Sequence, residues 1–172
     1  MFKKTISLII ITSFFWSCAT KPTATTDPEF EKIIFHTSAC FGDCPIYHLE
    51  VKNDKKVKLI TEKSFRNSKL KLNEPENRIP NYRIGTVNDT MFNQLAAELN
   101  TIGLESLEFD GSTCCDRPLI TIIVYYNGKR KLLQSMFPRD KANRLIEILY
   151  EVSKSNDYQK SNDAFSLEAV NK

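Results

Sequence analysis

HTSACFGDCPIYHLEV, residues 36–51, predicts a β-hairpin, because two strand-like runs flank a short turn with a glycine at its centre. If the turn is centred on that glycine, His36 lies opposite His48 and Cys40 lies opposite Cys44. The other face of the hairpin then carries an almost continuous apolar surface, as a sheet with one buried face requires. That surface is formed by Ile33 with Val51, Phe35 with Leu49, and Thr37 with Tyr47.

Two pairs of cysteines are candidates for disulfide bonds. Opposed strand residues have Cβ atoms about 4.5–5.5 Å apart, close to the roughly 3.5–4.5 Å of a disulfide, so Cys40 and Cys44 can be bridged with little adjustment. The second pair, Cys114 and Cys115, lies in a predicted loop. A bridge between the two pairs would close a loop of about 75 residues and contribute about 4 kcal/mol, whereas a bond between adjacent cysteines needs strained geometry. We expect structural disulfides and leave the connectivity open.

The spacing of His36, Cys40, Cys44 and His48 also raises the question of a metal site. At about 3.3 Å per residue, an extended strand places each histidine about 13 Å from the cysteine on its own strand. Metal bonds to imidazole or thiolate are only about 2.0–2.3 Å long. The four side chains are therefore not expected to share one ion, and we expect no cofactor.

The first 17 residues have the features of a bacterial lipoprotein signal. Two early lysines precede an apolar run over residues 6–16, which is too short to span a bilayer. Serine followed by Cys18 resembles a lipobox, so we expect acylation of Cys18, with residues 18–29 as a flexible tether. The alternative is an ordinary cleaved signal or an uncleaved anchor, because the residues before the serine are bulky. The lipoprotein interpretation places the protein in the cell envelope, on the periplasmic or outer-membrane side.

Residues 30–154 are predicted to form a single α+β domain, and residues 155–172 a loosely held polar tail. The expected architecture is an antiparallel sheet, built from a three-stranded meander and a later hairpin and covered by two helices. The expected elements are strands over 33–38, 46–52 and 57–63, an irregular excursion over 64–81, a short strand over 84–87, a helix over 88–102, a hairpin of strands 119–126 and 129–137, and a helix from 139.

Local signals fix several of these boundaries. Asn127-Gly128 is the strongest short-range hairpin signal in the chain. Asn88 or Asp89 can cap the first helix, and Gly103 is placed to end it. The helix between them carries apolar residues on one face, so it is expected to pack on the sheet.

The hairpin segment resembles a bacterial family, the domain of unknown function 6438, whose members carry a Cys-Phe-Gly-x-Cys-Pro-x-Tyr motif. A later stretch, CCDRPLITIIVYYNGKRK, resembles the Asp-x-Pro stretch and closing hairpin of the same family. The resemblance covers residues 31–153 and implies no known activity. The matching positions are Cys40, Phe41, Gly42, Cys44, Pro45, Tyr47, Asp116 and Pro118.

The chain lacks the sequence motifs of the common enzyme classes, namely a Gly-rich phosphate loop, a nucleophile elbow and an HExxH zinc motif. Its net charge of +3 falls further without the two leader lysines, so nothing indicates nucleic-acid binding. We therefore expect no catalytic residues and a lipid-anchored module that binds or scaffolds an unknown envelope protein or ligand. One alternative is thiol-redox or Cu(I) chemistry, because Cys-x-x-x-Cys-Pro is similar to Sco-type copper chaperones. Another is partner recognition through residues 64–81.

Overall fold

The computed structural model describes residues 30–40, 44–64 and 78–169. The predicted signal (1–17), the lipidation site Cys18, the tether (18–29) and the motif residues Phe41 and Gly42 lie outside this range. Among the described residues, neither helix is long and apolar enough to cross a membrane.

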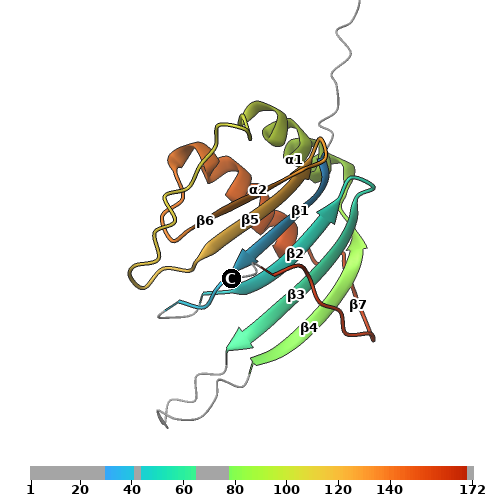
Figure 1. Cartoon of the computed structure of the whole chain (residues 1–172). Helices are drawn as coiled ribbons and strands as arrows, with labels where there is room; N and C mark the ends of the chain where they lie inside the picture. Colours follow the sequence, from blue (N-terminus) through green and yellow to red (C-terminus); the bar gives the residue numbers. More distant parts are fainter. Residues whose placement is uncertain (1–29, 41–43, 65–77, 170–172) are drawn as a thin grey trace, which may run out of the picture.

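The described residues form one antiparallel sheet of seven strands in the order β6-β5-β1-β2-β3-β4-β7, so the fold class is α+β (Figure 1). The first four strands make a four-stranded meander, one strand longer than expected, and the β5–β6 hairpin joins it beside β1. The strands are β1 (Phe30–Thr37), β2 (Ile46–Lys52), β3 (Lys56–Ser64), β4 (Arg78–Thr86), β5 (Ile120–Tyr126), β6 (Lys129–Ser135) and β7 (Gln159–Lys160).

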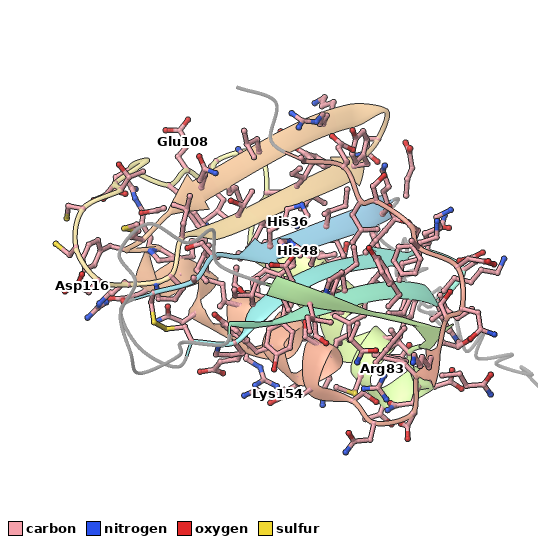
Figure 2. The ribbon with its side chains drawn as sticks, turned by 90° about the horizontal axis from the view of Figure 1, so that it is seen from below. His36, His48, Arg83, Glu108, Asp116 and Lys154 are labelled. Carbon is pink, nitrogen blue, oxygen red and sulfur yellow. A yellow bond between two sulfur atoms is a disulfide. The ribbon has the colours of Figure 1, made fainter. Side chains whose placement is uncertain are left out.

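The predicted register of the first hairpin is confirmed. Phe35 pairs with Leu49, and His36 pairs with His48, so the two histidines lie side by side on β1 and β2 (Figure 2). Thr37, the expected partner of Tyr47, contacts it through its side chain: the Thr37 hydroxyl accepts a hydrogen bond from the Tyr47 N–H at 2.9 Å. The same hydroxyl donates to the Pro45 carbonyl at 2.9 Å and so links the strands where their backbones separate.

The second hairpin and both helices also follow their local signals. Asn127 and Gly128 have φ angles of 49° and 67°, as a two-residue turn with two left-handed positions requires. Helix α1 (Asp89–Thr101) begins after Asn88, whose side chain accepts from the Met91 N–H at 2.9 Å. Helix α2 (Asn143–Lys154) follows a short 3₁₀ turn over Asp140–Ala142.

The two helices cover one face of the sheet and form the main core with it (Figure 1). Alternate residues of the central strands point into this core, which is what a period-2 pattern with one buried face predicts. The largest fully buried side chains on this side are Phe35, Ile33, Leu49, Leu59, Leu95, Leu107, Ile122, Leu145 and Ile148.

Strand β4 is longer than predicted. The expectation of an irregular segment up to residue 81 is wrong for its end, because residues from Arg78 onward pair with β3, and Pro80 lies opposite Glu62. Strand β7 covers only two residues of β4, so the part of β4 around Pro80 is an edge of the sheet. A proline is tolerated at an edge, because its missing N–H breaks no hydrogen bond of the ladder. Residues 65–77 lie outside the described range.

The C-terminal segment differs from the predicted loose tail. Tyr158 is buried in the core at 4% exposure, and β7 pairs with β4. Arg83 donates to the carbonyl oxygens of Ser155, Asn156 and Tyr158 at 2.7–3.3 Å. Residues 161–169, which we call the strap, then cross the face of the sheet opposite the helices (Figure 1). The segment is polar and has no hydrophobic period apart from Phe165 and Leu167, so its sequence did not predict this packing.

Candidate functional site

The first motif segment is closed by a disulfide bond between Cys40 and Cys44, whose Cα atoms lie 5.6 Å apart. The bond joins the end of β1 to the residues just before β2. In this oxidised state neither sulfur is a thiolate, the form that binds Cu(I).

The second cysteine pair is not bridged to the first, so the long-range connectivity considered from the sequence is absent. Cys114 and Cys115 are free and exposed, and their sulfurs lie 2.9 Å apart. The Cys115 thiol donates to Cys114, which lowers the pKa of the Cys114 thiol, while the same contact raises the pKa of Cys115. The structure therefore has no disulfide bond at this pair.

The two motif segments meet in space although they are far apart in sequence. The Ser38 N–H donates to the Leu119 carbonyl at 3.1 Å, and the Leu119 N–H donates to the Ser38 hydroxyl at 2.8 Å. This contact lies between the loop that holds the disulfide and the loop that holds Asp116. Asp116 itself is exposed at the tip of its loop, away from the two histidines (Figure 2).

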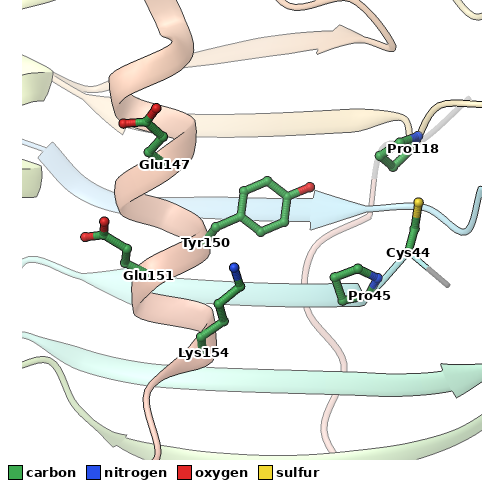
Figure 3. A pocket seen from close by; sticks show the side chains of 7 residues that line it. All are labelled: Cys44, Pro45, Pro118, Glu147, Tyr150, Glu151 and Lys154. Carbon is green, nitrogen blue, oxygen red and sulfur yellow. The ribbon is translucent and has the colours of Figure 1, made fainter.

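A pocket of about 360 Å³ lies at this junction, between the motif segments and helix α2 (Figure 3). It is lined by Cys44, Pro45 and Pro118 on one side and by Glu147, Tyr150, Glu151 and Lys154 on the other. The ring of the motif residue Tyr47 meets that of Tyr150 edge to face, with centroids 6.1 Å apart. The motif thus joins two loops to a helix.

The chemistry of this motif pocket favours a structural role. Its cysteine is oxidised, burial raises the pKa of Tyr150, and Glu147 is engaged by Arg144 at 3.3 Å. The lining cysteine is bonded to Cys40 and so is not available as a nucleophile in this state.

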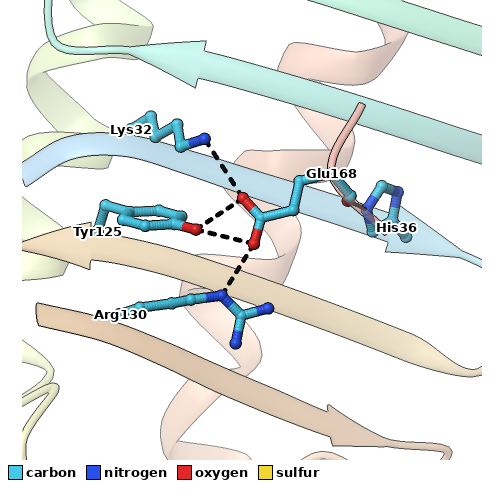
Figure 4. Close-up of polar contacts among 5 residues, drawn as sticks. All are labelled: Lys32, His36, Tyr125, Arg130 and Glu168. Carbon is cyan, nitrogen blue, oxygen red and sulfur yellow. Dashed lines mark hydrogen bonds and ion pairs between the residues drawn. The ribbon is translucent and has the colours of Figure 1, made fainter. Parts of the chain in front are cut away.

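A second candidate site lies on the opposite face of the sheet, where polar side chains of the sheet bind the carboxylate of Glu168 from the strap (Figure 4). Tyr125 donates its hydroxyl to both carboxylate oxygens at 2.8 and 2.7 Å. Arg130 Nε donates at 2.8 Å and Lys32 Nζ at 3.3 Å. We call Lys32, Tyr125 and Arg130 the carboxylate clamp.

The strand order builds the clamp. Lys32 of β1 pairs with Tyr125 of β5, and Tyr125 pairs with Arg130 of β6, so the three side chains form one row across three neighbouring strands. The Lys32 ammonium also lies 4.4 Å from the centroid of the Tyr125 ring. Burial alone would raise the pKa of Glu168, but hydrogen bonds from Tyr125, Arg130 and Lys32 outweigh it and lower that pKa. The clamp therefore holds an ionised carboxylate.

The two histidines lie on the same face as the clamp. Their Nδ1 atoms are 2.9 Å apart. His36 Nε2 lies 2.7 Å from the backbone carbonyl oxygen of Glu168, and His48 Nε2 lies 3.5 Å from a carboxylate oxygen of Glu62. Burial, as the largest cause, lowers the pKa of His36.

A pocket of about 380 Å³ separates the histidines from the strap. The sheet side is lined by His36, His48, Ile60 and Thr121, and the strap side by Phe165, Ser166, Leu167 and Ala169. In the part of the chain that the structure describes, no group of three or more His, Cys, Asp or Glu side chains could hold a metal ion. Of the four residues considered as a metal set, the structure pairs the histidines with each other and bonds the cysteines to each other.

Sequence reasoning found the histidine pair but missed the clamp. A possible signal was the polar character of Lys32, Tyr125 and Arg130 themselves, but no local pattern in the sequence states that β1 and β5 become neighbours. Glu168 carried no signal, because it lies in an aperiodic segment.

Comparison with known proteins adds one finding. The model of the family described as Domain of unknown function (DUF6438) matches residues 31–155. The matched range contains the disulfide, both histidines and the whole clamp, and it ends before the strap. No curated protein matches the chain.

Proposed function

The chain belongs to the DUF6438 family, whose description names no activity, and from this premise we propose that it is a lipid-anchored binding module of the cell envelope. The ligand we propose is an extended, acidic peptide segment of a partner protein, bound on the sheet face opposite the helices. The observation that carries this proposal is the carboxylate clamp, which holds Glu168 through Lys32, Tyr125 and Arg130.

The clamp is suited to bind a carboxylate from outside the domain. Two cations and a hydroxyl converge on one anion, and hydrogen bonds between charged groups are stronger than neutral ones. The three clamp residues lie within the matched residues 31–155, whereas the carboxylate comes from the strap beyond them. The receptor surface is thus part of the family domain, and its present occupant is an appended segment that another chain could replace.

The contacts of the strap indicate what a partner segment would resemble. The Phe165 ring packs edge to face on Tyr82, with centroids 5.2 Å apart, and lies 5.5 Å from the Lys58 ammonium. Glu168 follows three residues later in the clamp. A partner segment with an aromatic residue three positions before an acidic one would satisfy both contacts. The contact between its acidic side chain and the cations of the clamp would provide specificity.

The proposed location rests on the N-terminal sequence. The leader and the Ser17-Cys18 pair support acylation of Cys18, and residues 19–29 would hold the domain away from the bilayer. The Cys40–Cys44 bond is compatible with an oxidising compartment. Replacing Cys18 with serine is expected to move the protein from the membrane fraction to the soluble fraction. Unchanged membrane association of Cys18→Ser would contradict acylation as the anchor.

The binding proposal is tested with the full chain carrying Glu168→Gln, in which the clamp no longer holds its own carboxylate. The probe is a fluorescent peptide of residues 161–172 with its native glutamate. We expect the variant to bind this peptide at least tenfold more tightly than the unmodified protein does, as measured by fluorescence anisotropy. A peptide with glutamine at position 168 should lose this binding.

A matched pair of variants locates the site. Adding Arg130→Gln to the Glu168→Gln chain should abolish peptide binding, whereas adding Arg144→Gln, which lies on α2 behind the sheet, should leave it unchanged. Equal peptide binding with and without Arg130 would overturn the proposal, provided that urea unfolding shows both variants to be folded. Failure of the native peptide to bind the Glu168→Gln chain would overturn it as well.

A further inference from the structure

We propose that Cys114 and Cys115 form a thiol–disulfide exchange site, at which Cys114 attacks the disulfide bond of another molecule and Cys115 resolves the product. Both side chains are exposed in the loop before β5, and their sulfur atoms lie 2.9 Å apart. The class of substrate is a low-molecular-weight organic disulfide. This inference does not depend on the peptide-binding proposal, because it uses other side chains and a covalent chemistry.

The backbone at the pair adopts an unusual conformation. Cys115 has a φ angle of 78°, in the left-handed region that residues with a Cβ atom rarely occupy. Residues held in such regions are strained, and they cluster at functional sites, where the surrounding structure maintains the strain. Here the strained residue belongs to the pair whose sulfurs are in contact.

The loop that carries the pair is held on both sides. Before the pair, the Ser112 carbonyl accepts from the Met136 N–H at 2.7 Å. After the pair, the Leu119 N–H donates to the Ser38 hydroxyl at 2.8 Å. Between these two contacts the loop is exposed, and Asp116, the residue after the pair, points away from the sheet (Figure 2). The loop therefore presents the two thiols to solvent.

The hydrogen bonds of the pair distinguish its two sulfurs. The Cys115 thiol donates to the Cys114 sulfur, and the Ser112 hydroxyl lies 3.7 Å from that sulfur. Both contacts lower the pKa of Cys114, and the contact with Cys115 is the larger cause. The same contact raises the pKa of Cys115. Because the thiolate is the nucleophile, Cys114 is the attacking sulfur and Cys115 the resolving one.

The exchange takes place in two steps. In the first step, the Cys114 thiolate attacks one sulfur of the substrate R–S–S–R and forms a mixed disulfide, while the other half leaves as a thiolate and takes up the proton that Cys114 has lost. In the second step, Cys115 loses its proton and attacks the Cys114 sulfur. The Cys114–Cys115 bond forms, and the second half of the substrate leaves as a thiol. Two electrons and two protons thus pass from the pair to the substrate.

The product bond is strained, which makes the exchange reversible. The Cα atoms of consecutive residues lie about 3.8 Å apart, whereas most disulfides join Cα atoms about 4.4–6.8 Å apart. Strained and exposed disulfides are the labile ones. The Cα atoms of Cys40 and Cys44 are 5.6 Å apart, within the usual range. The chain therefore combines one stable bond with one exchangeable pair, which the structure shows in its reduced form.

The test uses the full chain with Cys18→Ser, in which Cys114 and Cys115 are the two free thiols among the remaining four cysteines. The reduced pair is treated with glutathione disulfide at neutral pH, and mass spectrometry follows the peptide that contains both residues. We expect this peptide to lose two hydrogen atoms, with release of two glutathione molecules per chain. Dithiothreitol should restore both thiols at a concentration that leaves Cys40–Cys44 closed.

Single variants separate the two roles. Cys115→Ser should accumulate glutathione on Cys114, because the resolving sulfur is gone while the serine hydroxyl can still donate to Cys114. Cys114→Ser should form its adduct on Cys115 at least tenfold more slowly. Ser112→Ala should slow the attack by Cys114. Ser106→Ala is the matched control and should leave the rate unchanged, because the Ser106 hydroxyl donates to the Gly103 carbonyl.

A glutathione adduct that persists on the unmodified pair, without release of the second glutathione, would overturn the exchange site. Absence of any reaction would do the same. Equal rates of adduct formation in Cys114→Ser and Cys115→Ser would overturn the assignment of Cys114 as the attacking sulfur. Because the main result is read on a chain that keeps both thiols, it stands even if a single variant fails to fold.

Discussion

The ring of Tyr158 occupies the space that a side chain at position 85 would need. A Cβ atom placed on Gly85 would lie 2.6 Å from Tyr158 Cδ1 and 3.3 Å from Tyr158 Cα. The contact brings the segment after α2 against β4 and is the point at which the C-terminal segment enters the core. The glycine is required here for close approach.

Gly85→Ala should destabilise the fold by about 1–3 kcal/mol, because the added methyl group forces Tyr158 out of its packed position. Urea unfolding followed by circular dichroism measures the change. Thr86→Ala, at the exposed neighbouring position, is the control and should stay within about 0.5 kcal/mol of the unmodified protein. Equal stability of Gly85→Ala and Thr86→Ala would show that the Tyr158 ring moves aside without cost.

Tyr158→Phe should be neutral or slightly stabilising near neutral pH. The Tyr158 hydroxyl is buried and has no hydrogen-bond partner among the described residues, so its removal avoids a desolvation cost. Comparing unfolding midpoints of the two proteins at pH 7 measures the effect. A loss above about 1 kcal/mol would indicate a partner for the hydroxyl.

The same substitution should change the alkaline limit of stability. Burial raises the pKa of Tyr158 to about 12, above the value near 10 of an unfolded tyrosine. Between these values the unfolded chain has released the proton and the folded chain has kept it, so stability falls as pH rises. The unmodified protein should lose up to about 2 kcal/mol more than Tyr158→Phe between pH 10 and 12. Parallel stability curves for the two proteins would contradict the raised pKa.

Arg83→Lys should loosen the turn between α2 and β7. The guanidinium group of Arg83 donates to three carbonyl oxygens, and a lysine ammonium cannot reproduce that planar fork. We expect a loss of about 1–2 kcal/mol and faster hydrogen exchange at the Ser161 N–H, which donates to the Tyr82 carbonyl at 2.8 Å. Arg144→Lys, in an exposed pair on α2, should show neither effect.

Alkylation followed by mass spectrometry checks the cysteine assignment. Without reduction, Cys114 and Cys115 should react and Cys40 and Cys44 should not. The double variant Cys40→Ser/Cys44→Ser should lose about 2 kcal/mol, because a bond that closes so short a loop restricts the unfolded chain only moderately. Resistance of Cys114 and Cys115 to alkylation before reduction, with release afterwards, would show that this pair is also oxidised in the cell.

The parts of the fold that the sequence predicted are those with local causes. The register of β1 and β2 follows from the alternation of apolar residues around one turn, and the β5–β6 hairpin follows from Asn127-Gly128. The α1 boundary follows from the Asn88 cap. Each of these signals lies within a few residues of the structure that it specifies.

The missed parts depend on contacts between distant segments. The clamp exists because β5 inserts beside β1, which places Tyr125 next to Lys32, and no short-range pattern states which strands become neighbours. The strap has no hydrophobic periodicity of its own, because its conformation depends on contacts with the sheet that it covers. The free state of Cys114 and Cys115 likewise follows from where their loop lies, which cysteine counting cannot reveal.

The position of β1 has a mechanical consequence. If Cys18 is held in a membrane as proposed, a pull along the chain enters the fold at Phe30, the first residue of a strand bonded to β2 on one side and to β5 on the other. The hydrogen bonds of both ladders run across the strand direction, so a force along β1 loads them together in shear. The domain would therefore be attached to the membrane through an interior strand of its sheet. Tension from a bound partner would not separate the strands one after another from an edge.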